Sequence, residues 1–329
     1  MKKRVLSGMR PTGPLHLGHL LGALENWRKL QDTHDCYFMV ADLHALMGEY
    51  EHPANIAEHT DKMIHDWLSF GIKAENIFVQ SQIPEHAELA LILGMLTPLG
   101  WLERNPTYKE QLREIEGRDL TTFGFLGYPV LQAADILLYK ANVVPVGEDQ
   151  LSHLELTREI VRRFNKLYAA DFFPEPEAML TQQPKILGTD RRKMSKSYGN
   201  AINLSDDEKT IREKVKSMIT DPARVKVSDP GHPEICNVFS YYKIFSGDQN
   251  LIGQVHAWCT GAKKGCTDCK NTFTDVLVAY LRSRQQGLQS PSLKKEVQDS
   301  LLGGQERARQ AARKTLNEVK TLLSLKATA

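Results

Sequence analysis

The segments Lys2-Lys-Arg-Val-Leu6, Pro11-Thr-Gly-Pro14 and His16-Leu-Gly-His19 decide the fold of this chain. The first predicts a short strand, the second a turn, and the residues from Leu17 onward a helix. A loop that leads from a strand into a helix presents free backbone N–H groups at the positive end of the helix dipole, where phosphate binds favourably. This order of elements therefore predicts a phosphate site on an α/β fold.

Two histidines and a glycine at the helix start carry the chemistry of this site. Gly18 has no side chain, so a nucleotide can approach the backbone closely. His16 and His19 offer hydrogen bonds to phosphate oxygens as negative charge develops in a pentacoordinate transition state. Taken alone the pattern is a weak indication, since paired histidines at a helix start also serve as surface or capping residues.

A basic segment, Lys193-Met194-Ser195-Lys196-Ser197, lies far downstream. We interpret residues 191–204 as a mobile loop whose ammonium groups close over a triphosphate and stabilise a departing pyrophosphate. A solvated basic loop is the alternative interpretation. The presence of both elements in one chain favours a site that binds ATP and acts between its α and β phosphates.

These residues resemble the two fingerprint motifs of class I aminoacyl-tRNA synthetases. The resemblance implies that Mg-ATP activates an amino acid, with His16 and His19 acting on the phosphates and Lys193 and Lys196 on the pyrophosphate. The ATP contacts that it implies are Arg10, Pro11, Thr12, Gly18, His19, Gly147, Glu148, Asp149, Ile186, Lys193, Met194, Ser195, Lys196 and Ser197.

The segment from Tyr128 to Tyr139 predicts a helix on which Tyr128, Gln132 and Asp135 share one face, because they are spaced four and three residues apart. That face is otherwise apolar, so Asp135 needs a hydrogen-bond donor, which an indole N–H or a phenol O–H would supply. The segment resembles the amino-acid pocket of tryptophanyl-tRNA synthetases, and also that of archaeal-type tyrosyl enzymes. It does not decide between the two amino acids.

The run from Val143 to Arg158 favours tryptophan. It predicts a strand, the turn Gly147-Glu148-Asp149-Gln150 and an amphipathic helix, and it closely resembles the tryptophanyl subfamily. The resemblance implies that the turn holds the ATP ribose and that Gln150 contacts the substrate. Glu148 and Asp149 also suit a helix N-terminus, where acids complement the dipole.

Three further positions follow from the resemblance or from the strand pattern. Arg10 stands where the family carries glutamine, and we expect it to pair with a phosphate or with the amino-acid carboxylate. His44 follows the predicted strand from Cys36 to Val40 and is expected at the pocket rim, with a structural role as the alternative. The tryptophan contacts are thus Asp135, Tyr128, Gln132, Gln150 and His44, while Cys36 fills the core.

Four of the five cysteines gather in the second half, as Cys236, Cys259, Cys266 and Cys269. No signal peptide or transmembrane run is apparent in the sequence, so we expect the reducing cytoplasm, where disulfides are rare and a metal site is favoured. Zinc and iron–sulfur clusters both accept four thiolates. One Cys-x₂-Cys pair with two distant single ligands resembles the [4Fe–4S] site of some bacterial tryptophanyl enzymes, and zinc is the alternative.

The alternation of strands and helices in the first half predicts a doubly wound, Rossmann-like parallel sheet, with strands near Val5, Tyr37, Phe78 and Val143. We expect a catalytic domain at 1–190, interrupted at about 84–125 by a helical insertion. The resemblance implies that this insertion forms a homodimer seam. Residues 205–329 are expected to be a helical anticodon-binding domain, with Ser205-Asp-Asp-Glu208 as a capping start and a terminal helix over Gln305–Leu323.

Composition agrees with an RNA-binding enzyme that has local basic patches. The 329 residues suit two domains, and 41% hydrophobic residues can form a core. The net charge is only +2, so the expected partner, tRNA(Trp), must bind local arginine and lysine clusters. A nucleotidyltransferase that makes a dinucleotide cofactor and a non-enzymatic RNA-binding paralogue are the alternative functions.

Overall fold

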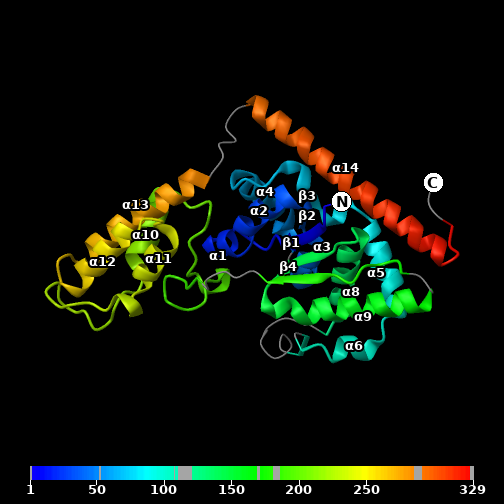
Figure 1. Cartoon of the computed structure of the whole chain (residues 1–329), viewed down its shortest axis with the longest axis horizontal. Coiled ribbons are helices and arrows are strands. Elements are labelled where there is room, and N and C mark those ends of the chain that lie inside the picture. Colours follow the sequence, from blue (N-terminus) through cyan, green and yellow to red (C-terminus); the bar gives the residue numbers. More distant parts are fainter. Residues whose placement is uncertain are drawn as a thin grey trace.

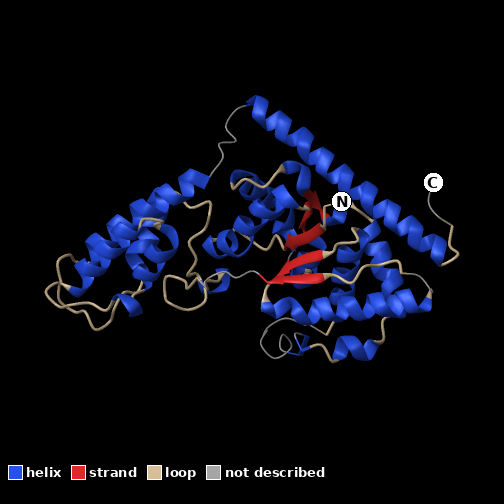
Figure 2. Cartoon of the chain, viewed as in Figure 1, coloured by secondary structure: helices blue, strands red, loops and turns tan. Residues whose placement is uncertain are grey.

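The computed structural model describes residues 2–51, 53–106, 108–109, 121–168, 171–180, 186–284 and 291–326. Its centre is a five-stranded, entirely parallel sheet with the order β3-β2-β1-β4-β5 (Figure 2). The strands are β1 (Arg4–Met9), β2 (Asp35–Val40), β3 (Ile77–Val79), β4 (Val143–Val146) and β5 (Glu177–Leu180). The predicted doubly wound fold is confirmed, and β5 is a strand that the sequence pattern did not predict.

The strand order reverses at β1. The chain moves outward through β2 and β3 on one side of β1 and then returns to its other side with β4. Ligands of open α/β sheets bind at such a switch point, outside the carboxyl ends of the strands. Gly8 lets β1 approach β2 closely, because an added Cβ would lie 2.7 Å from the carbonyl oxygen of Met39.

Helices cover both faces of the sheet (Figure 1). Residues alternate along β2, so that Cys36, Phe38 and Val40 join one buried cluster while Tyr37 and Met39 join another. The helices of this half are α1 (Leu17–His19), α2 (Glu25–Thr33), α3 (Asp42–Glu49), α4 (Ile56–Ser69), α5 (Glu85–Leu96), α6 (Leu99–Glu103), α8 (Phe123–Leu138) and α9 (Leu151–Leu167). Cys36 is 1% exposed, as expected for a core residue.

The second half is helical, as predicted, and four of its helices form a separate group beside the sheet (Figure 1). They are α10 (Glu208–Ser217), α11 (Asn237–Phe245), α12 (Gln249–Thr260) and α13 (Cys266–Arg284). The N-cap of α10 is Asp207, not Ser205, because the Asp207 carboxylate accepts the N–H of Thr210 at 2.7 Å. No helix of the described residues is long and apolar enough to cross a membrane.

The terminal helix α14 (Pro291–Leu322) starts earlier than predicted and packs against the sheet, not within the group of four helices (Figure 1). Its residues Ala308, Ala312 and Leu316 join the buried cluster that covers one face of the sheet. The range 205–329 therefore contains a helix that contacts the first half, and the proposed domain boundaries stay a prediction.

A glycine and a glutamine of α14 fasten it to the edge strand β3. The Gln305 side chain accepts the N–H of Val79 at 2.8 Å and donates to the carbonyl oxygen of Val79 at 3.4 Å, as a neighbouring strand would. At Gly304 an added Cβ would lie 2.7 Å from the carbonyl oxygens of Ala74 and Ile77. The close approach of α14 to the edge of the sheet thus depends on this glycine.

We predict opposite effects for two neighbouring glycine substitutions in α14. Gly303→Ala should stabilise the protein by about 0.5–1 kcal/mol, since alanine favours a helix and an added Cβ meets no atom within 4 Å. Gly304→Ala should destabilise it by roughly 1–3 kcal/mol, because the helix must move away from β3. Urea unfolding measures both; equal gains in stability would show that α14 does not pack as described.

Candidate active site

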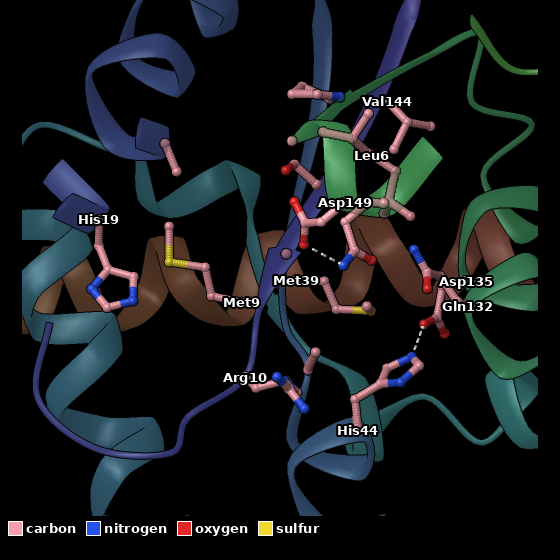
Figure 3. Close-up of a pocket in the computed structure, with 18 of the residues that line it drawn as sticks. Leu6, Met9, Arg10, His19, Met39, His44, Gln132, Asp135, Val144 and Asp149 are labelled. Atoms are coloured by element: carbon pink, nitrogen blue, oxygen red, sulfur yellow. Dashed lines mark hydrogen bonds and ion pairs between the residues drawn. The ribbon is translucent and has the colours of Figure 1, made fainter. Parts of the chain in front are cut away.

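A cavity of about 610 Å³ opens at the carboxyl ends of β1, β2 and β4 (Figure 3). His19 lies toward one end and Asp135 with Gln132 toward the other, and Met9 and Met39 lie between them. The predicted residues that line the cavity are Arg10, Thr12, Gly18, His19, His44, Tyr128, Gln132, Asp135, Gly147, Asp149, Gln150 and Lys196. The cavity therefore joins residues predicted for ATP to residues predicted for tryptophan.

His16 and His19 hold each other and the start of α1 in place. His16 Nδ1 accepts the N–H of Gly18 at 3.1 Å, and His19 Nδ1 accepts the N–H of His16 at 3.1 Å. Their ring centroids are 3.9 Å apart. A Cβ at residue 18 would lie 2.8 Å from the His16 ring, so the packing of His16 requires a glycine at this position.

Both imidazoles are neutral at neutral pH. Burial and the nearby charge of Lys196 lower the pKa of His16 to about 4, and burial, His16 and Lys196 lower the pKa of His19 to about 3. Because each Nδ1 accepts a backbone N–H, each ring proton resides on Nε2. The two rings thus present neutral N–H donors, which suit phosphate oxygens without adding charge.

Lys196 reaches the strand–loop–helix segment across 183 residues of sequence. Its ammonium group donates to the carbonyl oxygen of Gly13 at 2.9 Å. Burial and the charge of Arg10 lower the pKa of Lys196 to about 8. Two cations therefore face one cavity, and an anion between them would relieve their repulsion.

Asn200 organises the basic segment. Its side chain accepts the N–H of Ser195 at 2.9 Å and donates to Asp190 at 2.7 Å and to the carbonyl oxygen of Lys193 at 3.1 Å. Backbone hydrogen bonds also join the two motifs, from Leu17 N–H to Ile202 O at 3.0 Å and from Leu204 N–H to Leu15 O at 2.8 Å. The mobility expected for residues 191–204 stays a prediction.

Several residues predicted for ATP do not line the cavity. Lys193 is exposed, and Pro11, Ile186 and Met194 are buried beside the site. His16 is buried next to His19 and does not line the cavity either, and the side chain of Ser197 lies outside the described part of the chain. The others that do not line it are Glu148 and Ser195.

Asp135 is a fully buried carboxylate at the other end of the cavity, with 1% exposure. It accepts hydrogen bonds from His44 Nε2 at 2.7 Å, from His86 Nδ1 at 2.6 Å and from Gln80 Nε2 at 2.8 Å. Burial alone would raise its pKa, but the interactions with His44 and His86 outweigh burial and lower the pKa to about 2. Asp135 is thus an ionised acceptor, with donors that the sequence did not reveal.

Tyr128 is held by a second buried histidine. Its hydroxyl lies 2.8 Å from His153 Nε2, and His153 Nδ1 lies 3.2 Å from the Asn105 side chain. Burial raises the pKa of Tyr128 to about 12, while the charge of Arg10 opposes this, so the phenol keeps its proton. Tyr128 therefore lines the cavity with its hydroxyl in the neutral form.

Gln80 and His86 are functional-site candidates that the sequence motifs did not indicate, although their position in the chain carries a signal. Gln80 follows β3 directly, just as His44 comes soon after β2. Carboxyl ends of parallel strands meet at one edge of a sheet, so polar residues after β3 belong on the list of candidates.

The four clustered cysteines lie at helix ends in the group α10–α13. Cys236 caps α11, Cys259 is near the end of α12, and Cys266 and Cys269 are in the first turn of α13. All are free thiols, and burial together with the neighbouring thiols raises the pKa of Cys269 to about 12. Within the described ranges, no three His, Cys, Asp or Glu side chains are arranged to hold a metal ion.

Comparison with known proteins agrees with this geometry. Residues 1–282 match the family model described as tRNA synthetases class I (W and Y). The chain is 50% identical to the tryptophan–tRNA ligase of Thermotoga maritima, over 98% of this chain and 99% of that protein. It is 40% identical to the ligase of the same name from Aquifex aeolicus, over 98% of this chain and all of that protein.

A solved structure is similar over the same length. It is the tryptophanyl-tRNA synthetase of Campylobacter jejuni complexed with ADP and tryptophan, with a TM-score of 0.87 and 30% identity. The alignment covers 98% of this chain and 100% of that chain. The fold, the converging motifs and these whole-length similarities show that the chain belongs to the class I tRNA synthetases for tryptophan and tyrosine.

Proposed function

We propose that this chain is a tryptophan–tRNA ligase that joins L-tryptophan to ATP, giving tryptophanyl-adenylate and pyrophosphate, and then transfers tryptophan to the 3′ end of tRNA(Trp). The observation that carries the proposal is the single cavity that receives Lys196 and His19 at one end and Asp135 at the other. The family assignment and the whole-length relatives support an aminoacyl-tRNA synthetase over the nucleotidyltransferase and the non-enzymatic paralogue.

The chemistry requires positioning and charge, and no protein nucleophile. The tryptophan carboxylate attacks the α-phosphorus of Mg-ATP in line with the departing pyrophosphate. The Nε2–H groups of His16 and His19 stabilise the pentacoordinate centre and the phosphates, and Lys193 and Lys196 stabilise the pyrophosphate. Arg10, which lies near Lys196 and Tyr128, pairs with a phosphate or with the substrate carboxylate.

The remaining ATP contacts are the ones that the sequence indicated. Gly147 and Asp149 line the cavity and hold the ribose, and Gln150, which donates to Asp149 at 2.9 Å, faces the substrate. A Cβ at Gly147 would lie 2.5 Å from the Asp149 carboxylate, so the glycine leaves room for this turn.

The tryptophan end combines one ionised acceptor with apolar walls. Asp135 accepts the indole N–H, and Tyr128 and Gln132 hold the α-amino group. Leu6, Met39, Ile136 and Val144 line the cavity and cover the ring. An ionised carboxylate with several N–H donors around it favours a further N–H donor from the substrate.

We predict that Lys196→Ala slows tryptophan-dependent exchange of labelled pyrophosphate into ATP by roughly 10²- to 10³-fold, because a preorganised cation is lost from the transition state. Tryptophan affinity, measured by calorimetry, should change little, since Lys196 lies at the phosphate end. Lys62→Ala, which removes a lysine from the surface of α4, is the matched control and should exchange normally.

Two results would count against this function. Normal exchange by Lys196→Ala would remove the proposed role of that lysine. Among the twenty amino acids, exchange driven by tyrosine instead of tryptophan would show that the amino-acid assignment is wrong.

We also propose that the four cysteines hold a [4Fe–4S] cluster, with zinc as the alternative. Burial raises the pKa of the Cys236 thiol, and the N–H groups of Val238 and Phe239 at the start of α11 partly oppose this rise. Gly231 leaves room for Cys259, since an added Cβ would lie 2.5 Å from its sulfur. Arg224 lies 4.0 Å from the Cys266 sulfur and would offset thiolate charge. Four thiols are the donor set that such a cluster takes, although within the described ranges they are not arranged to hold a metal ion. A bound cluster would tie the ends of α11, α12 and α13 together.

We predict that protein purified without oxygen contains about four iron and four acid-labile sulfide per chain. Cys266→Ser should lower both contents and the unfolding temperature. Cys36→Ala, which changes the core cysteine of β2, should leave both contents unchanged. Equimolar zinc without sulfide would contradict the cluster and support the alternative metal.

The proposed enzyme is a cytoplasmic homodimer. Large apolar side chains are exposed on α5, α6 and the start of α8, including Met95 at 78% and Phe123 at 89%. They fall within the predicted insertion at 84–125, of which residues 107 and 110–120 lie outside the described part, and they support a homodimer seam. Five free cysteines fit the reducing cytoplasm, where tRNA is charged.

A further inference from the structure

The donors of Asp135 approach it from two sides. His44 lines the cavity and donates to Oδ2 (Figure 3). Gln80 and His86 are 0% exposed and do not line the cavity, so they contact the carboxylate from behind. Gln80 Nε2 lies 2.8 Å from Oδ1 and 3.0 Å from Oδ2, and His86 Nδ1 lies 2.6 Å from Oδ1.

The ring of His86 is fixed by what lies on its far side. Its Nε2 is 2.8 Å from the hydroxyl of Tyr139, a residue that is 0% exposed. An ionised carboxylate only accepts, so Nδ1 of His86 carries the proton that is donated to Asp135. Nε2 then accepts the Tyr139 O–H. The chain of groups Tyr139, His86 and Asp135 therefore has one consistent direction of hydrogen bonding.

We propose that His86, oriented by Tyr139, is a positioning residue that holds Asp135 as a fixed carboxylate acceptor, with Gln80 as the second donor from behind. The proposal rests on the indole contact proposed above for Asp135, and it names the residues that make this contact selective. An ionised carboxylate accepts about four hydrogen bonds, so three protein donors leave room for one donor from the cavity.

The buried Asp135 carboxylate needs these hydrogen-bond donors, because a carboxylate in an apolar pocket protonates unless donors stabilise its charge. A protonated Asp135 would offer an O–H to the substrate and would no longer require an indole N–H. The titratable and charged groups that face this network are His44 from α3, Glu85 and His86 from α5, Tyr37 from β2 and Arg307 from α14.

The first test measures the KM for tryptophan in pyrophosphate exchange between pH 5 and pH 8. In the unaltered enzyme the KM should be flat over this range, because the pKa of Asp135 is about 2. His86→Leu removes a donor from a buried carboxylate, which raises the pKa of Asp135. The KM should then rise by ~10- to 100-fold and should rise further as the pH falls. The KM for ATP and kcat should stay within about twofold of the original values.

Two companion variants separate positioning from packing. His86→Asn keeps an N–H near the Nδ1 position and should recover most of the tryptophan affinity. Tyr139→Phe leaves the imidazole without its orienting hydroxyl and should raise the KM in the same pH-dependent way, by a smaller factor. Thr274→Val, which removes a buried hydroxyl from α13, is the control for a general loss of stability and should leave the pH profile flat.

The second test uses a tryptophan analogue in which sulfur replaces the indole N–H. The unaltered enzyme should discriminate against it by ~100-fold or more, because the analogue leaves a buried acceptor unpaired. His86→Leu should reduce the preference for tryptophan over the sulfur analogue, since a partly protonated Asp135 no longer requires an N–H donor.

The outcomes distinguish this proposal from the function on which it rests. A pH-independent effect of His86→Leu, or equal losses in kcat and in the affinity for ATP, would overturn the positioning role. The same holds if Asp135→Asn damages tryptophan binding while His86→Leu does not. An Asp135→Asn enzyme with an unchanged KM would instead refute the indole contact itself.

Discussion

The hydrogen bond from the Lys196 ammonium group to the carbonyl oxygen of Gly13 joins the basic segment 193–197 to the loop before the His16-Leu-Gly-His19 motif. It brings a basic segment from the middle of the chain onto the first strand–loop–helix unit, where β1 ends. The contact lies at the edge of the parallel sheet where the strands end. Free backbone N–H groups and the cavity are found at this same edge. Together with the backbone hydrogen bonds from Leu17 to Ile202 and from Leu204 to Leu15, this contact places a half-buried lysine near two neutral histidines.

The electrostatics of the cavity follow from its two ends. At the phosphate end, burial keeps His16 and His19 neutral while Lys196 and Arg10 supply the positive charge. At the amino-acid end, burial would neutralise Asp135, and His44 and His86 keep it ionised. In the proposed reaction, the cations lie where ATP brings negative charge, and Asp135 lies where the substrate brings an N–H. This separation of charge would orient a polar substrate along the cavity.

Local patterns predicted much of this arrangement. The apolar strands β1 to β4 and the motif histidines were readable because each is decided within a few residues. Gln80 and His86 were not, since their role depends on Asp135, some fifty residues away in sequence. The packing of α14 could not be predicted either, because an alanine-rich pattern predicts a helix but not the element against which it packs. The roles of Gln305 and Gly304 are visible only once α14 lies beside β3. β5 has two half-buried and two exposed residues and carries too weak a pattern.

The most direct measurement of the central claim is the pKa of the Lys196 ammonium group, followed by NMR of isotope-labelled lysines and assigned with Lys196→Arg. In the free enzyme, burial and Arg10 should place this pKa at about 8. A non-hydrolysable ATP analogue adds phosphate charge beside the ammonium group and should raise the pKa above that value. A pKa at the ordinary 10.5 in both states would contradict the account, because Lys196 would then lie in solvent and not against the nucleotide site.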